Sequence, residues 1–149
     1  MKQLDPHYIR KIGLSGLIPY VLLSLACWIV HPGWMEYFIS GQLSFGIALL
    51  SLMGGIHWGV VFMSPEKEME DKKRMLLWGV LPGAIAWFSL INTGLGFLVQ
   101  MLAFIFSYHI DKKLYAMWGL PDWFVQERYR LTCIMVGAQV LTFLAANIR

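Results

Sequence analysis

Hydrophobic residues occupy five long blocks of this chain, and short polar segments separate the blocks. The blocks cover about 12–30, 42–63, 75–91, 95–110 and 131–147, and none of these positions holds Asp, Glu, Lys or Arg. A helix needs about 20 mostly apolar residues to cross the ~30 Å hydrocarbon core of a bilayer. The pattern therefore predicts an all-α membrane protein, a bundle of five transmembrane helices that forms a single domain over residues 1–149.

The third and fourth blocks are the shortest, at roughly 16 or 17 residues each, which is close to the lower limit for a crossing. Asn92-Thr93-Gly94 joins them in a tight turn, so a re-entrant pair is the alternative interpretation. Two full crossings are preferred because the flanking charges require both. The aromatic and charged segment 114–130 is expected to lie on the cytoplasmic membrane surface, and the fifth helix to begin near Pro121.

The charges between the blocks predict the orientation. With a cytoplasmic N-terminus, five crossings leave Arg149 as the only one of the 12 lysines and arginines on the other side. The cytoplasmic side holds Lys2, Arg10, Lys11, Lys67, Lys72, Lys73, Arg74, Lys112, Lys113, Arg128 and Arg130. This asymmetry follows the positive-inside rule and predicts a C-terminus on the opposite side. The same frame places tryptophans in belts at both membrane boundaries: Trp28, Trp34, Trp78, Trp118 and Trp123.

Composition excludes other classes of protein. Hydrophobic residues make up 58% of the chain and charged residues 14%, against about a quarter charged in soluble domains. The net charge of +3 comes from basic residues beside apolar blocks, so their expected partner is the lipid bilayer and not nucleic acid. A cleaved signal peptide is the alternative for the first block, but the block is long and no small-x-small cleavage site follows it.

Four glycines form small-xxx-small pairs, Gly55 with Gly59 and Gly79 with Gly83. Such pairs allow the backbones of membrane helices to approach closely. We expect them to mediate helix packing within the protein. Contact with a second copy of the chain or with another protein is the alternative.

His57 lies about two turns inside the cytoplasmic end of the second block, where a polar side chain requires a partner. Pro19 and Pro82 each remove one helical hydrogen bond and free the carbonyls of Ser15 and Trp78. One hypothesis is a structural histidine bonded to a carbonyl freed in this way. The other is a ligand or proton site.

Polar and kinked positions gather toward the cytoplasmic half of the predicted bundle, which suggests a pocket open to the cytoplasm. An amphipathic ligand such as a quinone, lipid or porphyrin suits a site with aromatic walls. The candidate ligand-binding residues are His57, Trp58, Pro82, Tyr108, His109 and Asp111.

No catalytic or metal-binding motif occurs in the sequence, and the two cysteines, Cys27 and Cys133, lie in apolar blocks without metal-ligand spacing. We therefore predict no catalytic residues, no metal site and no cofactor. Axial ligation of haem by His57 and His109, or a bound quinone, is the weaker alternative.

Three stretches resemble the domain-of-unknown-function 3429 (DUF3429) family: Gly54-Gly55-Ile56-His57-Trp58-Gly59, Leu81-Pro82 with Ala86-Trp87, and Pro121-Asp122-Trp123-Phe124 before 128–132. The resemblance covers essentially the whole chain. It implies a multi-pass protein of a Gram-negative bacterial inner membrane or, by analogy with the mitochondrial transmembrane protein 69, of a mitochondrial inner membrane, and it transfers no reaction. Tryptophan-rich sensory proteins, which bind porphyrins, share only the five-span architecture.

The sequence thus favours a non-enzymatic accessory, assembly or binding subunit of the inner membrane. The alternative is a binder or transporter of a small amphipathic ligand with a pocket around His57. A transporter needs a continuous polar route, and the outer halves of the predicted spans offer little besides Gln42 and Gln100. A membrane enzyme is the third hypothesis.

Overall fold

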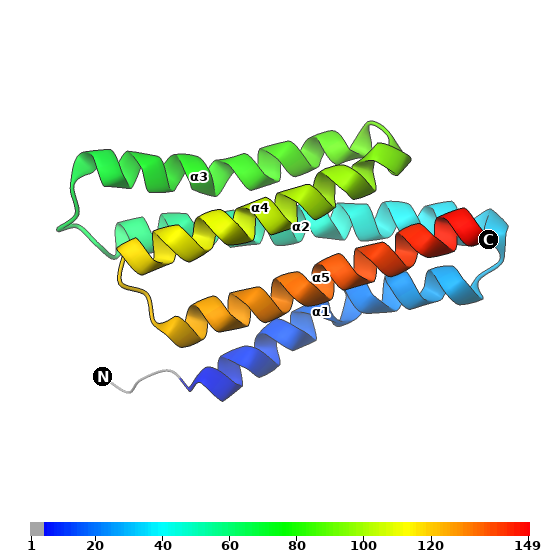
Figure 1. The fold of residues 1–149 in the computed structure, drawn as a ribbon, viewed down its shortest axis with the longest axis horizontal. Coiled ribbons are helices and arrows are strands. Elements are labelled where there is room, and N and C mark those ends of the chain that lie inside the picture. The colour runs from blue at the N-terminus through cyan, green and yellow to red at the C-terminus, as the bar shows by residue number, and fades with distance from the viewer. Residues whose placement is uncertain (1–4) are drawn as a thin grey trace. The chain divides into compact units, whose positions relative to one another are not determined.

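The computed structural model describes residues 5–149, except for the side chain of Thr93; Lys2 of the charge count lies outside the described residues. Helices and short connections make up this part of the chain, which contains no strand, so the all-α prediction is confirmed. The elements are α1 (Pro6–Ile29), η1 (Pro32–Trp34), α2 (Met35–Phe62), α3 (Met69–Trp87), η2 (Phe88–Leu90), α4 (Thr93–Met117) and α5 (Asp122–Ile148) (Figure 1).

Four of the described helical segments are long and apolar enough to cross a membrane: Pro6–Ile29, Pro32–Phe62, Gly94–Met117 and Asp122–Ile148. The protein is therefore a multi-pass membrane protein. The predicted third span is not among the four, because the first turns of α3 carry five charged residues, 70–74, before the apolar stretch begins.

The connections between helices follow local sequence signals. The side-chain oxygen of Asn92 accepts hydrogen bonds from the backbone N–H groups of Gly94 (3.0 Å) and Leu95 (3.2 Å), which caps the start of α4. Gly119 has φ of 76°, a left-handed conformation that suits glycine, in the connection from α4 to α5. The fifth helix begins after Pro121, as predicted. Segment 114–130 consists mainly of the last turn of α4 and the first turns of α5, so it extends these two helices.

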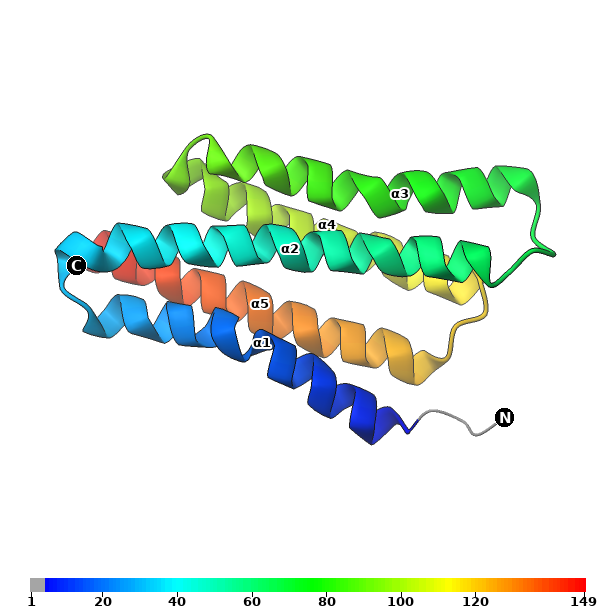
Figure 2. The same cartoon turned by 180° about the vertical axis from the view of Figure 1, so that it is seen from behind.

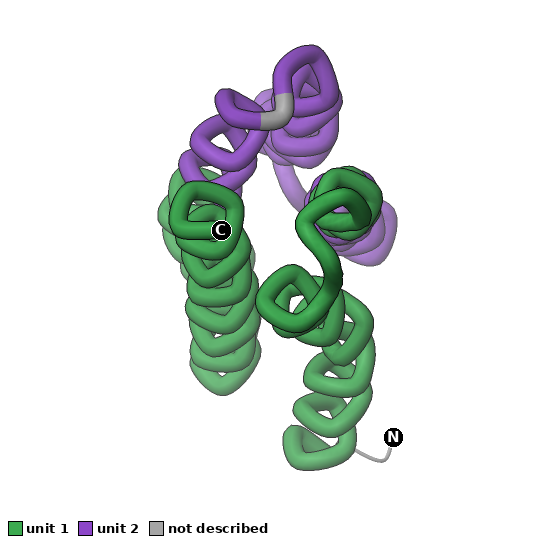
Figure 3. The backbone as a smooth tube through the Cα atoms, turned by 90° about the vertical axis from the view of Figure 1, so that its right-hand side faces the viewer, with its two compact units in different colours: residues 1–42, 105–149 green, residues 43–104 purple. Residues whose placement is uncertain are grey.

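The described chain separates into two compact units, which Figure 3 shows in different colours. Unit 1 contains residues 1–42 and 105–149, and unit 2 contains residues 43–104. The long helices α2 and α4 each contribute residues to both units.

In unit 1, α1 and α5 lie side by side and run in the same direction (Figure 1). Arg10 contacts Glu127 at one end, the Ser24 hydroxyl donates to the Ala138 carbonyl at 2.8 Å, and Arg149 donates to the Cys27 carbonyl at 2.8 Å. Residue numbers therefore rise together along both helices. The part of α4 that belongs to unit 1 runs antiparallel to α5, because Asp111 pairs with Arg128 and the Tyr115 ring packs edge-to-face against Phe124.

α1 changes direction near its middle, as Figure 2 shows. Pro19 lies inside the helix and has no N–H to donate to the Ser15 carbonyl, so it accounts for a bend in this region. This agrees with the kink expected from the sequence.

In unit 2, α2 and α3 run antiparallel. Along the contact, Ser51 meets Gly83, Gly54 meets Gly79, and His57 meets Met75. The side-chain amide of Gln100, on α4, donates to the Leu43 carbonyl at 2.6 Å and to the Ser89 hydroxyl at 3.0 Å. These bonds satisfy a fully buried glutamine and fasten α4 to α2 and η2.

Candidate functional site

In unit 2, Gly54 of α2 and Gly79 of α3 bring the backbones of these two helices very close together. A Cβ atom on Gly54 would overlap the Gly79 carbonyl oxygen, and one on Gly79 would lie 2.7 Å from the Gly54 carbonyl oxygen. A Cβ on Gly83 would lie 2.8 Å from the Ser51 hydroxyl oxygen. Only residues without a side chain allow backbones to come this near.

The position of this contact differs from the expectation for α2. Gly79 and Gly83 face α2, but a Cβ at Gly55 or Gly59 would have no described atom within 4 Å outside its own helical surroundings. The reason is helical phase, since Gly55 lies about 100° around the helix from Gly54. Gly54 therefore forms the contact inside the chain, and Gly55 and Gly59 present a small, exposed surface.

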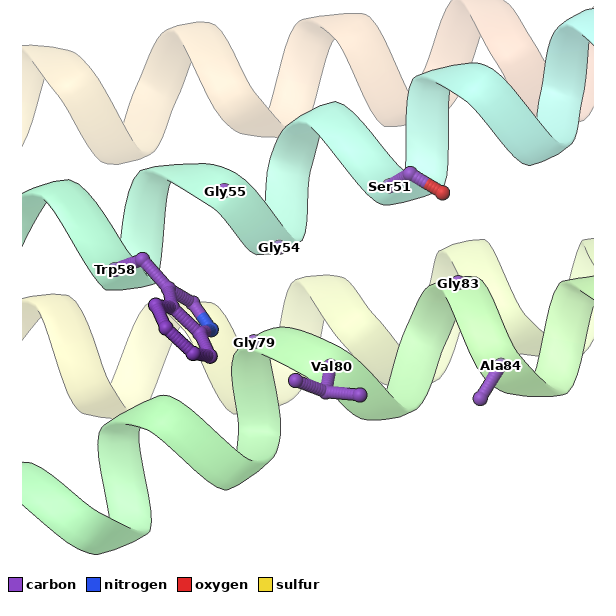
Figure 4. A pocket seen from close by; sticks show the side chains of 8 residues that line it. All are labelled: Ser51, Gly54, Gly55, Trp58, Gly79, Val80, Gly83 and Ala84. Carbon is purple, nitrogen blue, oxygen red and sulfur yellow. The ribbon is translucent and has the colours of Figure 1, made fainter.

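A groove of about 400 Å³ lies between α2 and α3 and is lined in part by the glycines of this contact. Figure 4 shows the Trp58 ring projecting from α2 toward α3, beside Gly79. Six of the eight lining residues are Gly, Ala or Ser, so small side chains and backbone atoms form most of the groove surface. The lining residues are Ser51, Gly54, Gly55, Trp58, Gly79, Val80, Gly83 and Ala84.

His57 lies next to Trp58 in the sequence but does not line the groove. Its side chain is buried, and Nδ1 lies 3.3 Å from the Met75 carbonyl oxygen of α3. The carbonyl in this contact differs from that of Trp78, which Pro82 frees. The histidine thus links α2 to α3 two turns from Pro82, and its role as a ligand residue stays a prediction.

Pro82 lies in unit 2 with His57 and Trp58, whereas the three predicted ligand residues on α4, Tyr108, His109 and Asp111, lie in unit 1 and have different surroundings. Asp111 is buried and accepts a hydrogen bond from Arg128 Nε at 3.2 Å. Tyr108 packs against the rings of His109 and Tyr129, each at 5.4 Å between centroids, and His109 is exposed. The six predicted ligand residues are therefore divided between the two units, and their common pocket stays a prediction.

A buried polar cluster surrounds Asp111, and the sequence analysis did not identify it. Arg128, assigned there to the cytoplasmic flank, is buried and donates from Nε to Asp111, from Nη2 to Ser107 at 3.1 Å and from Nη1 to Thr132. The fully buried Tyr115 side chain also lies beside Asp111. All three guanidinium nitrogens have a partner, so the cluster fastens α4 to α5.

Helical spacing carries a signal for this cluster. Ser107, Asp111 and Tyr115 recur every four residues on one face of α4, and Arg128 and Thr132 do so on α5. Polar residues that repeat at this spacing on two neighbouring spans can meet across the helix contact.

Side chains that could bind a metal ion do not form a cluster among the described residues. Among residues 5–149, no group of three His, Cys, Asp or Glu side chains is placed to hold a metal ion.

Comparison with known proteins identifies the family of this chain. The sequence model of the family described as "Protein of unknown function (DUF3429)" matches residues 6–144. Transmembrane protein 69 of Xenopus tropicalis is 27% identical over 147 residues, 96% of this chain and 56% of the relative. Transmembrane protein 69 of Mus musculus is 22% identical over 145 residues, 97% of this chain and 58% of the relative. The chain thus spans somewhat more than half the length of these curated relatives, and no solved structure matches it.

Proposed function

Because the chain belongs to the DUF3429 family and is similar to two proteins named transmembrane protein 69, we propose that it is a five-span accessory or assembly subunit of a bacterial inner membrane. In this proposal the chain binds a transmembrane helix of another subunit and catalyses no reaction itself. The observation that carries the proposal is the groove between α2 and α3, with its exposed glycines.

The parallel direction of α1 and α5 supports five spans. Both helices are long and apolar enough to cross the membrane. If both cross and run the same way, the chain must cross an odd number of times between them. α2 and α4 supply two crossings, so α3 is needed as the third.

Charge supports the same count. With α3 crossing, eleven of the 12 lysines and arginines lie on the side of the N-terminus. Without it, Lys112, Lys113, Arg128 and Arg130 would move to the opposite side. The positive-inside rule therefore favours five spans, with the N-terminus in the cytoplasm and the C-terminus outside.

The groove between α2 and α3 has the form and the small residues that a partner helix needs to pack closely. Gly55 and Gly59 are one turn apart on α2 and have open space around them, the arrangement that allows close approach of a partner helix. Trp58 and Val80, at the same groove, offer apolar contact area to that helix. A second copy of this chain or a different subunit could supply it.

Purification of the full chain from its native membrane in mild detergent, followed by mass spectrometry of intact complexes, tests this proposal. We expect a stoichiometric partner or a homo-oligomer that Gly55→Leu and Gly59→Leu remove without loss of folded yield. Leu102→Ala, at an exposed position on α4 and away from the groove lining, is the control and should retain the complex. A monomer in the parent protein, or a complex unaffected by both glycine variants, would contradict the proposal.

Binding of a small amphipathic ligand is the second proposal, and the Trp58 ring at the groove favours it. A quinone, lipid or porphyrin could stack on this ring within a volume of about 400 Å³. The same experiment separates the two proposals, since a ligand adds a small mass and a partner adds a protein.

A further inference from the structure

Glu127 of α5 brings two arginine side chains together in unit 1. Its Oε1 accepts a hydrogen bond from Arg10 Nε of α1 at 2.9 Å and another from Arg130 Nη1 at 3.0 Å. The Glu127 side chain is 11% exposed, whereas those of Arg10 and Arg130 are 37% and 48% exposed. The carboxylate offsets the repulsion between the two guanidinium groups, and the cluster retains a net positive charge.

Both arginines keep N–H groups available. A guanidinium carries five N–H donors in a planar fork. Glu127 engages one nitrogen of each arginine, and residues 5–149 provide no other hydrogen bond or ion pair to either side chain. Forked donors of this kind match the oxygens of a phosphate group, so the cluster is prearranged for a phosphate at the membrane boundary.

An apolar groove of about 240 Å³ begins one helical turn away from these arginines, also in unit 1. Arg10, Leu14 and Ile18 are spaced four apart and share a face of α1, while Arg130 and Ile134 share a face of α5. The groove is lined by Leu14, Leu17, Ile18, Val21, Leu22 and Ile134.

The dimensions of this strip match one leaflet of a bilayer. From Arg10 to Leu22, α1 rises by about 18 Å at 1.5 Å per residue. Half of a ~30 Å hydrocarbon core is about 15 Å. The two lengths are similar. A lipid with its phosphate at Arg10 would therefore reach the end of the groove with an acyl chain that spans one leaflet.

We propose that α1 and α5 form a binding site for an anionic phospholipid. Its phosphate binds Arg10 and Arg130, and one acyl chain lies in the groove from Leu14 to Ile134. The net positive charge of the cluster selects against zwitterionic lipids, because a headgroup ammonium would be repelled by the arginines. This site is separate from the α2–α3 groove and does not depend on the assembly proposal.

The test is intact-mass spectrometry of the full chain in detergent, with dioleoyl phosphatidylglycerol and dioleoyl phosphatidylcholine added at equal concentrations. We expect phosphatidylglycerol to be retained preferentially, by about fivefold for each arginine that contributes. Arg10→Gln combined with Arg130→Gln should bring the two lipids to equal retention. Lys113→Gln removes an exposed cation from the end of α4 and should leave the preference unchanged.

Two further arms address the acyl chain and the source of the phosphate. Ile134→Trp fills the groove and should reduce retention of phosphatidylglycerol while the arginines remain, which also covers the case that the double variant fails to fold. Millimolar inorganic phosphate should not displace the lipid. Equal retention of both lipids by the parent protein, an equal loss in Lys113→Gln, an unchanged Ile134→Trp, or displacement by phosphate would each overturn the proposal.

Discussion

Arg128 Nε lies 3.2 Å from Asp111 Oδ2, and both side chains are almost completely buried, with exposed fractions of 3% and 2%. The two residues join α5 to α4 and are surrounded by Ser107, Thr132 and Tyr115. A charged pair in such a position costs free energy to desolvate, and its geometry and additional hydrogen bonds offset that cost. Each charged side chain therefore needs the other in order to remain buried without a large loss of stability.

Loss of one partner should destabilise the protein more than loss of both. Asp111→Ala leaves the Arg128 guanidinium buried without its counter-charge, which should cost about 3–5 kcal/mol. Asp111→Leu combined with Arg128→Met replaces the pair by apolar side chains and should recover most of that loss. Thermal unfolding in detergent measures both, with Lys112→Ala at the adjacent exposed position as control. An Asp111→Ala protein that melts like the parent would show that the pair contributes nothing.

Leucine at Gly54 and at Gly55 should have opposite consequences for folding. Gly54→Leu forces its side chain into the Gly79 backbone and should cost about 3 kcal/mol or prevent folding. Gly55→Leu enters open space and should leave the unfolding temperature near that of the parent. Folded yield by size-exclusion chromatography and thermal unfolding compare the two. Equal behaviour of the neighbouring variants would be inconsistent with the α2–α3 contact.

His57→Ala should lower stability by about 1–3 kcal/mol, because it leaves the Met75 carbonyl without this partner and opens a cavity between α2 and α3. His57→Gln keeps a donor of similar reach and should recover part of the loss. The measurements are thermal unfolding and the mass of co-purifying small molecules. Loss of a bound molecule with unchanged stability would establish His57 as a ligand residue instead.

Gln42 should tolerate an apolar replacement. Its side chain is fully buried, and neither amide atom has a hydrogen-bond partner among the described residues. An unsatisfied buried amide costs about 1–3 kcal/mol, so Gln42→Leu should raise the unfolding temperature in detergent. Gln100→Leu is the matched contrast, since it removes two bonds and should lower that temperature. A destabilised Gln42→Leu protein would indicate that a bound molecule or partner satisfies the amide.

Topology is testable with alkaline-phosphatase fusions. A fusion after Arg149 should be active and one within 65–68 inactive, because five spans place these sites on opposite sides of the membrane. A fusion within 31–33 should also be active. An inactive fusion after Arg149, together with an active one in the loop before α3, would reverse the proposed orientation. Equal activity of the fusions after Arg149 and within 65–68 would show an even number of crossings between these two sites, which contradicts five spans.

Hydropathy alone was sufficient for the helical, membrane-spanning class, because the backbone in a bilayer must satisfy its hydrogen bonds within each helix. It did not predict that α4 continues to Met117, whereas the start of α5 near Pro121 was predicted from the proline. The first turns of α5 lie in segment 114–130, and two charged residues there have partners on other helices: Arg128 pairs with Asp111, and Glu127 with Arg10. The charge pattern did not predict that Arg128 and Glu127 are buried, because their burial depends on a neighbouring helix.

What the sequence determined by itself is the set of local properties: apolar blocks long enough to cross, glycines that permit close packing, and the resemblance to a family. Only the tertiary structure decided that Gly54 and not Gly55 meets α3, that Arg128 is buried, and that α1 runs parallel to α5. The physical reason is that these relationships depend on which helix faces which and at what rotation. A shift of one residue turns a helix by about 100°, which changes a buried contact into an exposed surface without altering composition or hydropathy.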